Sequence, residues 1–121
     1  GLPAAETSVE RCLLWFDDLL AGGSLLEVVE GPMDALKLRA LGHRHVTCLF
    51  TNTPSRGQVD LLREVAPRFE RRVVLLDRGA EAQALGAAQE LAALGFRAAW
   101  LPAGADDPGE LTPELLAKVR Y

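Results

Sequence analysis

Apolar residues gather in four short runs along the chain, and each run is followed by a stretch with helical spacing. The runs are 25–29, 46–50, 73–76 and 97–101. They are apolar at most successive positions, which is typical of parallel strands buried on both faces. The stretches between them are 31–41, 58–65 and 80–94. Strands that alternate with helices at this spacing predict an α/β fold, with four parallel strands in one sheet flanked by helices.

Local stop and start signals agree with these helices. Pro32 suits the first position of the helix over 31–41, because its missing N–H has no partner to lose there, and Gly42 ends that helix. Pro67 stops the helix that follows. The expected inner faces are Met33, Leu36, Ala40 and Leu41 in the first of these helices, and Val59, Leu62 and Val65 in the second.

Both ends of the chain add a predicted helix. At the amino end, Thr7 or Ser8 caps a helix through about Ala21, which we expect to pack on the flank of the sheet. Its apolar face is Val9, Cys12, Leu13, Phe16, Leu19 and Leu20. At the other end, a last helix is expected over 112–119. We therefore expect one domain over 1–121, with an N-terminal helical extension at 1–22 and a core at 25–119.

Composition limits the classes of function. The chain has 121 residues with 49% apolar side chains, enough for one small domain with a real core. Its formal net charge is −4, so any contact with nucleic acid is local or uses a partner domain. Arg68, Arg71 and Arg72 cluster before the third strand, as a solvated strand entry or as a local phosphate contact. We expect a cytoplasmic protein with no membrane partner, because there is no 18-residue apolar run and no signal-peptide pattern.

Cysteine and histidine residues give little support for a zinc site. Cys12 and Cys48 have no Cys-x-x-Cys spacing and are interpreted as buried small hydrophobic residues. His43 and His45 form a His-x-His, but no further histidine completes a tetrahedral ligand set.

Acidic residues follow two of the predicted strands. Glu30 comes directly after 25–29, Asp34 falls in the first turn of the next helix, and Asp77 comes directly after 73–76. Acids at strand ends are common in structural roles. However, the carboxyl ends of parallel strands share one sheet edge, which is where open α/β sheets bind ligands. Clustered carboxylates repel one another unless protonated or bridged by a cation, and oxygen ligands suit Mg²⁺ or Mn²⁺.

The order of these signals resembles the Toprim domain, in the branch of bacterial-type DNA primases and primase–helicases. The matching features are Val-Val-Glu-Gly-Pro-Met-Asp-Ala-Leu at 28–36, Thr51 with Gln58, and Asp-Asp-Pro-Gly-Glu-Leu at 106–111. This resemblance implies a Rossmann-like sheet, Glu30 as general acid/base, and Asp34, Asp77 and Asp107 as carboxylates on the side of a Mg²⁺ or Mn²⁺ ion.

One departure from the Toprim pattern bears on activity. Asp77-Arg78-Gly79 stands where the family has Asp-x-Asp, so the second carboxylate is missing and metal binding is expected to be weak or absent. The resemblance implies the Toprim domain of a primase-like DNA replication protein. It would act in nucleic-acid binding or in metal-dependent nucleotidyl transfer.

Two alternatives to that function are a non-catalytic Toprim-fold interaction module and a nuclease-type phosphodiesterase. The expected partners are a DNA or RNA primer-template, bound through adjoining domains, and a helicase or other replication protein. A receiver-like or flavodoxin-like nucleotide-binding domain has less support, since no glycine-rich phosphate loop follows the first strand.

Overall fold

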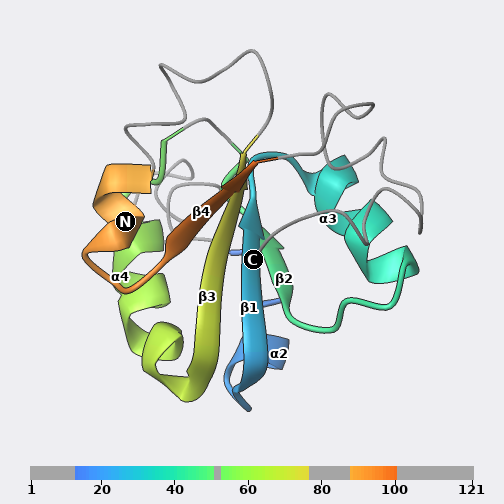
Figure 1. Cartoon of the computed structure of the whole chain (residues 1–121), viewed down its shortest axis with the longest axis horizontal. Helices are drawn as coiled ribbons and strands as arrows, with labels where there is room; N and C mark the ends of the chain where they lie inside the picture. The colour runs from blue at the N-terminus through green and yellow to red at the C-terminus, as the bar shows by residue number, and fades with distance from the viewer. Residues whose placement is uncertain (1–12, 51–52, 77–87, 101–121) are drawn as a thin grey trace, which may run out of the picture.

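The computed structural model of the chain describes residues 13–50, 53–76 and 88–100. Its centre is a four-stranded sheet in which every strand pair is parallel, in the order β2-β1-β3-β4 (Figure 1). The strands are β1 (Gly23–Val29), β2 (Val46–Cys48), β3 (Phe69–Leu76) and β4 (Arg97–Trp100). The α/β fold with four parallel strands, predicted from the sequence, is thereby confirmed.

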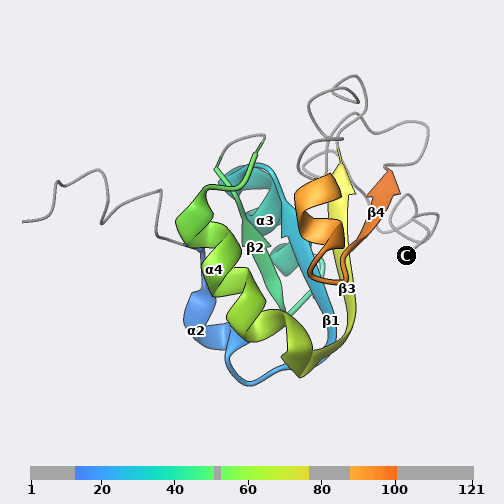
Figure 2. The same cartoon turned by 90° about the vertical axis from the view of Figure 1, so that its left-hand side faces the viewer.

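Helices cover both faces of the sheet. The described helices are α2 (Phe16–Leu19), α3 (Pro32–Ala40), α4 (Arg56–Val65) and the short 3₁₀ helix η2 (Ala66–Arg68). Residues 88–92 are also helical. Figure 2 shows α4 and the 88–92 segment on one face and α3 on the other. None of the helices among the described residues is long and apolar enough to cross a membrane.

Two apolar clusters fill the space between the helices and the sheet. On the α4 face, Leu62 and Val65 pack with Val28, Val74 and Leu91. The cluster on the α3 face consists of Val29, Ala35, Leu38, Val46, Cys48, Val73, Leu75 and Ala99. The predicted burial of Val28, Leu49, Leu75 and Cys48 is confirmed, whereas Cys12 lies outside the described residues.

The inner face of α3 differs from the predicted one. Ala35 and Leu38 are fully buried, whereas Met33 is 72% exposed and Leu36 is 49% exposed. Ala40 is exposed as well. The expected inner face was therefore wrong for these three residues, whereas the fourth, Leu41, is half-buried and packs against the cluster on the α3 face as predicted. The helix carries apolar residues on more than one side, so their spacing does not decide which side packs, and small Ala35 permits close approach to the sheet.

The amino-terminal helix is also much shorter than predicted in its described part. Leu13 and Leu14 are not helical, and α2 covers four residues, beginning after Trp15 in the left-handed conformation with φ 56°. Leu13 and Leu19 pack in the cluster on the α4 face, while Leu14 and Trp15 pack against the cluster on the α3 face. Neighbouring residues here thus pack on opposite faces of the sheet, and the described helix begins only after the left-handed residue Trp15.

Strand β3 begins four residues earlier than predicted, so Arg71 and Arg72 lie within the strand. Arg68 lies just before it, and its Nη1 donates to the carbonyl oxygen of Leu20 at 2.7 Å. A Cβ at Gly22, which has φ +72°, would collide with the carbonyl oxygen of Arg68. These contacts fasten the entries of β1 and β3 together at the amino edge of the sheet. The predicted elements at 1–12, 80–87, 102–109 and 112–119 lie outside the described residues.

Candidate functional site

Glu30 sits at the carboxyl end of β1, one of the two central strands. It follows Val29 directly, is half-buried, and its Oε1 atom is buried. Gly31 then adopts an extended conformation as the N-cap of α3, with Pro32 in the first turn as predicted. The chain therefore turns sharply after Glu30 and holds its carboxylate at the edge of the sheet.

Asp34 lies close to that turn. It is half-buried in the first turn of α3, where the positive end of the helix dipole favours a carboxylate. A Cβ built at Gly31 would lie 3.4 Å from Asp34 Oδ2, so this oxygen lies over the residue that follows Glu30. The structure thus brings two of the predicted site residues, Glu30 and Asp34, to adjacent positions at one edge.

The other two predicted acids, Asp77 and Asp107, lie outside the described residues. Strand β3 runs parallel to β1, and its last residue, Leu76, lies at the same edge as Glu30. Within the described part of the chain, no group of three or more His, Cys, Asp or Glu side chains is placed to hold a metal ion. Glu30 and Asp34 are oxygen donors of the kind that Mg²⁺ accepts, because that ion commonly takes one or two carboxylates beside water and substrate phosphates.

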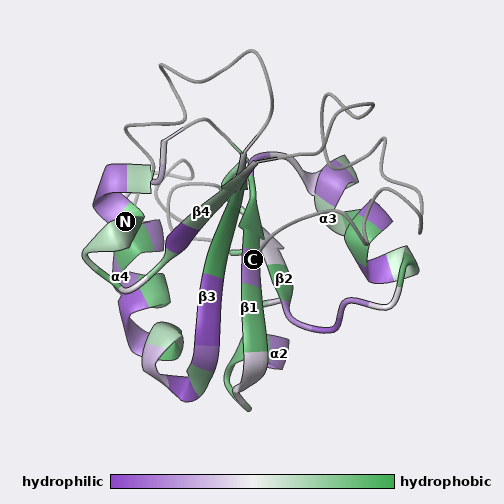
Figure 3. Cartoon of the chain, in the orientation of Figure 1, coloured by the Kyte–Doolittle hydropathy of each residue, from purple (hydrophilic) through white to green (hydrophobic). Residues whose placement is uncertain are grey.

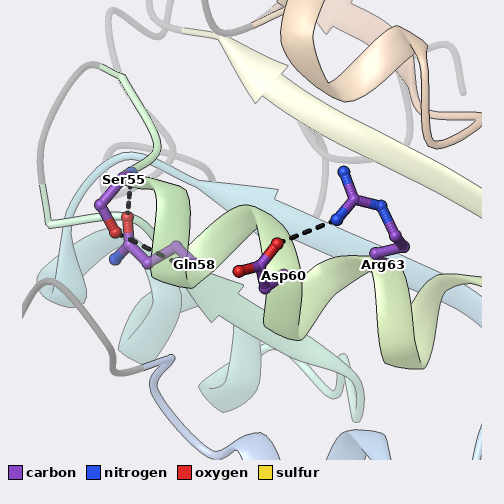
Figure 4. Close-up of polar contacts among 4 residues, drawn as sticks. All are labelled: Ser55, Gln58, Asp60 and Arg63. Carbon is purple, nitrogen blue, oxygen red and sulfur yellow. Dashed lines mark hydrogen bonds and ion pairs between the residues drawn. The ribbon is translucent and has the colours of Figure 1, made fainter.

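Gln58, which the sequence pointed to only as part of the Toprim pattern, supports the carboxyl edge of the sheet. Its side chain is buried, and Nε2 donates to the carbonyl oxygen of Leu49 at 2.9 Å. Gln58 N donates to Ser55 Oγ at 3.1 Å, and Ser55 N donates to Gln58 Oε1 at 3.0 Å (Figure 4). This capping box fixes the start of α4 against the end of β2. Thr51, the other half of that motif, lies outside the described residues.

A buried acid–histidine pair was not predicted. Glu27 lies in the middle of β1, is 2% exposed, and stands between Val46 and Val73 in the strand register. Its Oε1 hydrogen-bonds Nδ1 of His43, which is half-buried in the loop before β2. This hydrogen bond raises the pKa of His43 above its ordinary value, although burial of the ring acts in the opposite direction. An acid within an apolar strand needs a partner, and that signal could have singled out Glu27, although not the residue that pairs with it.

A cavity opens at the opposite, amino edge of the sheet. Its volume is about 490 Å³, and it is lined by Asp17, Asp18, Ala21, Arg39, Gly42, His43, Arg44 and His45. Arg39 crosses one wall, with its Nη1 3.0 Å from Asp18 Oδ2 and its guanidinium 4.4 Å from the centre of the Trp15 ring. His43 binds Glu27 and His45 packs edge-on against Phe69, so each ring of the His-x-His has a structural contact of its own.

This α/β fold resembles that of solved primase structures, so the resemblance predicted from the sequence is confirmed at the level of the fold. The DnaG catalytic core superposes with a TM-score of 0.67 at 20% identity. The DnaG primase catalytic domain bound to ssDNA gives 0.63 at 21% identity. The primase fragment of the bacteriophage T7 primase-helicase protein gives 0.55 at 19% identity.

The three matches cover most of this chain but a smaller part of each solved structure. They cover 93%, 88% and 84% of this chain, and 37%, 35% and 43% of those chains, in the same order. This chain therefore spans less than half the length of the proteins it resembles. No protein-family model matches the sequence, and no curated protein matches it.

Proposed function

We propose that this chain is the Toprim domain of a primase-like DNA replication protein and that its carboxyl edge binds the phosphates of nucleotides or nucleic acid. The observation that carries the proposal is the position of Glu30 at the end of central strand β1, beside Asp34. This position is where ligands bind in parallel α/β sheets. The fold likeness to primase catalytic cores supports the same interpretation.

In this proposal Glu30 handles protons and the aspartates bind a cation. Glu30 is half-buried at the edge, where its carboxylate can take a proton from, or return one to, a substrate oxygen. Asp34, with Asp77 and Asp107, would hold Mg²⁺ or Mn²⁺. When bound, the ion would neutralise phosphate charge during nucleotidyl transfer.

A second candidate is a non-catalytic module that binds nucleic acid or a replication protein. It is favoured by Gly79, which stands where the Toprim pattern has a second aspartate, and by Arg78, which adds a positive charge beside Asp77. A nuclease-type phosphodiesterase would use the same edge. In each case we propose a cytoplasmic protein whose primer-template and helicase contacts involve adjoining domains.

Mn²⁺ titration of the ¹⁵N-labelled chain tests the proposed site. Paramagnetic Mn²⁺ should broaden the amide signals of Gly31 and Asp34 before those of α4. Glu30→Gln should weaken that effect, because it removes a negative charge beside Asp34 even though Glu30 is not proposed as a metal ligand. Glu64→Gln, which removes an exposed carboxylate on α4, is the matched control and should change nothing. If broadening at Gly31 is the same in the wild type and in Glu30→Gln, the proposed site is wrong.

A further inference from the structure

A pocket rich in arginine lies at the amino ends of β3 and β4. Its volume is about 200 Å³, and we call it the arginine pocket; its lining residues are Glu70, Arg71, Arg72, Val73, Gly95 and Arg97. Figure 3 shows that the amino-terminal half of β3 is hydrophilic while its carboxyl-terminal half is hydrophobic. Three arginines and one glutamate are among its lining residues, so their summed formal charge is positive although the whole chain is acidic.

Arg72 is held in place by two backbone neighbours. Its Nη1 donates to the carbonyl oxygen of Ala66 at 3.0 Å, and a Cβ at Gly95 would lie 3.1 Å from its Cζ atom. The guanidinium is therefore held against the backbone at Gly95. Its Nε atom is buried, with no hydrogen-bond partner among the described residues. A buried N–H without an acceptor is unfavourable, and an anion would supply one.

Arg71 and Arg97 complete the positive wall. Both are exposed. Arg97 pairs with Val73 in the strand register, and Arg71 lies two residues before Val73, so side-chain alternation places both arginines on the α3 face of the sheet. Arg72 alternates to the opposite face and lies beside Gly95, so arginines from both faces of the sheet line the pocket. Arg68 is different, because it is close in sequence but bonds the carbonyl of Leu20 and does not line the pocket.

We propose that the arginine pocket binds a phosphate group. Guanidinium groups donate paired hydrogen bonds to phosphate oxygens, and a tetrahedral anion accepts donors that converge from several directions. The pocket is smaller than the roughly 300–1,000 Å³ typical of sites that enclose a whole small molecule. It therefore fits a phosphate group whose nucleoside or neighbouring nucleotides remain outside.

This site is separate from the carboxyl edge. Arg71 and the last residue of β3, Leu76, are five residues apart along the strand, a distance of about 16 Å. The proposal needs no metal ion and does not depend on Glu30. It gives a binding role to the arginine pocket, which the proposed function does not use.

Titration of the ¹⁵N-labelled chain with inorganic phosphate, in buffer containing EDTA, tests the proposal. Phosphate should shift the amide signals of Arg72, Val73 and Arg97. The double variant Arg71→Gln/Arg97→Gln should weaken phosphate binding about tenfold or more, because each charge-assisted contact contributes strongly. The matched control Arg56→Gln/Arg63→Gln removes the same charge from exposed positions on α4 and should weaken binding less than about twofold.

The controls also separate a site from general charge attraction. Equal losses in the two double variants, with unchanged melting temperatures, would overturn the proposal, as would shifts spread evenly over α4. Arg72→Lys keeps the charge but lacks the buried Nε–H, so it should also bind phosphate more weakly; wild-type affinity in this variant would equally overturn it.

Two further ligands identify the source of the phosphate. A nucleoside monophosphate and a short oligothymidylate are titrated under the same conditions. Tighter binding of the oligonucleotide, lost in Arg71→Gln/Arg97→Gln, identifies a nucleic-acid backbone, whereas tighter binding of the monophosphate, lost in the same variant, identifies a free nucleotide. Either pattern supports phosphate binding in the arginine pocket. Binding of both ligands without any loss in the double variant contradicts it.

Discussion

The two edges of the sheet carry opposite chemistry. At the carboxyl edge, Glu30 and Asp34 come from the turn between β1 and α3. At the amino edge, Arg71, Arg72 and Arg97 surround a small pocket. All strands of a parallel sheet start at one edge and end at the other, so residues at equivalent strand ends gather although they are far apart in sequence. The net charge of the chain therefore does not tell at which edge an anion or a cation would bind.

The edges also differ in how they are held together. Gln58 and Ser55 support the carboxyl edge through neutral hydrogen bonds. On the amino side, the loop before β2 is attached through a buried ion pair between Glu27 and His43. A neutral network changes little with pH, whereas a pair that includes histidine responds near neutrality. This contrast predicts that the amino edge is the more sensitive to pH.

The largest expected effect comes from breaking the ion pair. His43→Ala should lower the free energy of unfolding by up to about 3–5 kcal/mol, because Glu27 is left buried without its histidine partner. Arg44→Ala, at the exposed neighbouring residue, should change it by less than about 0.5 kcal/mol. Urea unfolding followed by circular dichroism measures both. Similar small losses in the two variants would show that the pair does not fasten the amino edge.

The next effect concerns the apolar centre that both edges share. Leu75→Ala should lower the free energy of unfolding by about 2–5 kcal/mol, since Leu75 lies in β3 and is fully buried in the cluster on the α3 face. Leu36→Ala, on the exposed side of α3, should cost less than about 0.5 kcal/mol. The same urea experiment compares them. A loss below about 1 kcal/mol for Leu75→Ala would contradict its central position.

A smaller effect follows from the raised pKa of His43. Its folded pKa lies above the ordinary value of 6.5, so the stabilisation is fully present below about pH 6.5 and is lost as pH rises through the raised pKa. The melting temperature should therefore fall over this interval, and His43→Ala should flatten the curve. An unchanged slope in the variant would assign the pH dependence to another group.

The smallest expected effect concerns metal binding at the carboxyl edge. Gly79→Asp restores the second acid of the Toprim pattern and should raise the stabilisation by millimolar Mn²⁺ by on the order of 1 kcal/mol over the wild type. Without metal, the same change should destabilise the fold through carboxylate repulsion. Melting curves with and without Mn²⁺ measure both. A wild type that already gains several degrees, with no further gain in Gly79→Asp, would favour the catalytic hypothesis.

The sequence predicted the strands better than the helix faces. Runs such as Val73–Leu76 are apolar at every position and have one interpretation, and Glu30 at a strand end was located correctly. Helix α3 is apolar on more than one side, so spacing selected Met33 and Leu36 where the structure buries Ala35 and Leu38. The break at Trp15 depends on packing against both faces of the sheet, which no local pattern contains.

The candidate sites also differ in how far the sequence alone could predict them. Glu30 and Asp34 are close in sequence, so a local pattern sufficed to place them together. The pair of Glu27 and His43 joins residues from a strand and from a later loop, and the arginine pocket joins β3 to β4. These contacts depend on strand order and register. Neither contact can be predicted from one sequence without knowing which strands are neighbours.

The tryptophans give each edge an optical reporter. The chain contains two, Trp15 and Trp100. Trp15 lies beneath the Arg39 guanidinium near the amino edge, while Trp100 is the last residue of β4 at the carboxyl edge. Trp100→Phe would leave fluorescence emission from Trp15 alone, and Trp15→Phe would leave emission from Trp100. Stopped-flow mixing of these two variants with denaturant would time the loss of each edge separately and show whether the sheet opens from one side first.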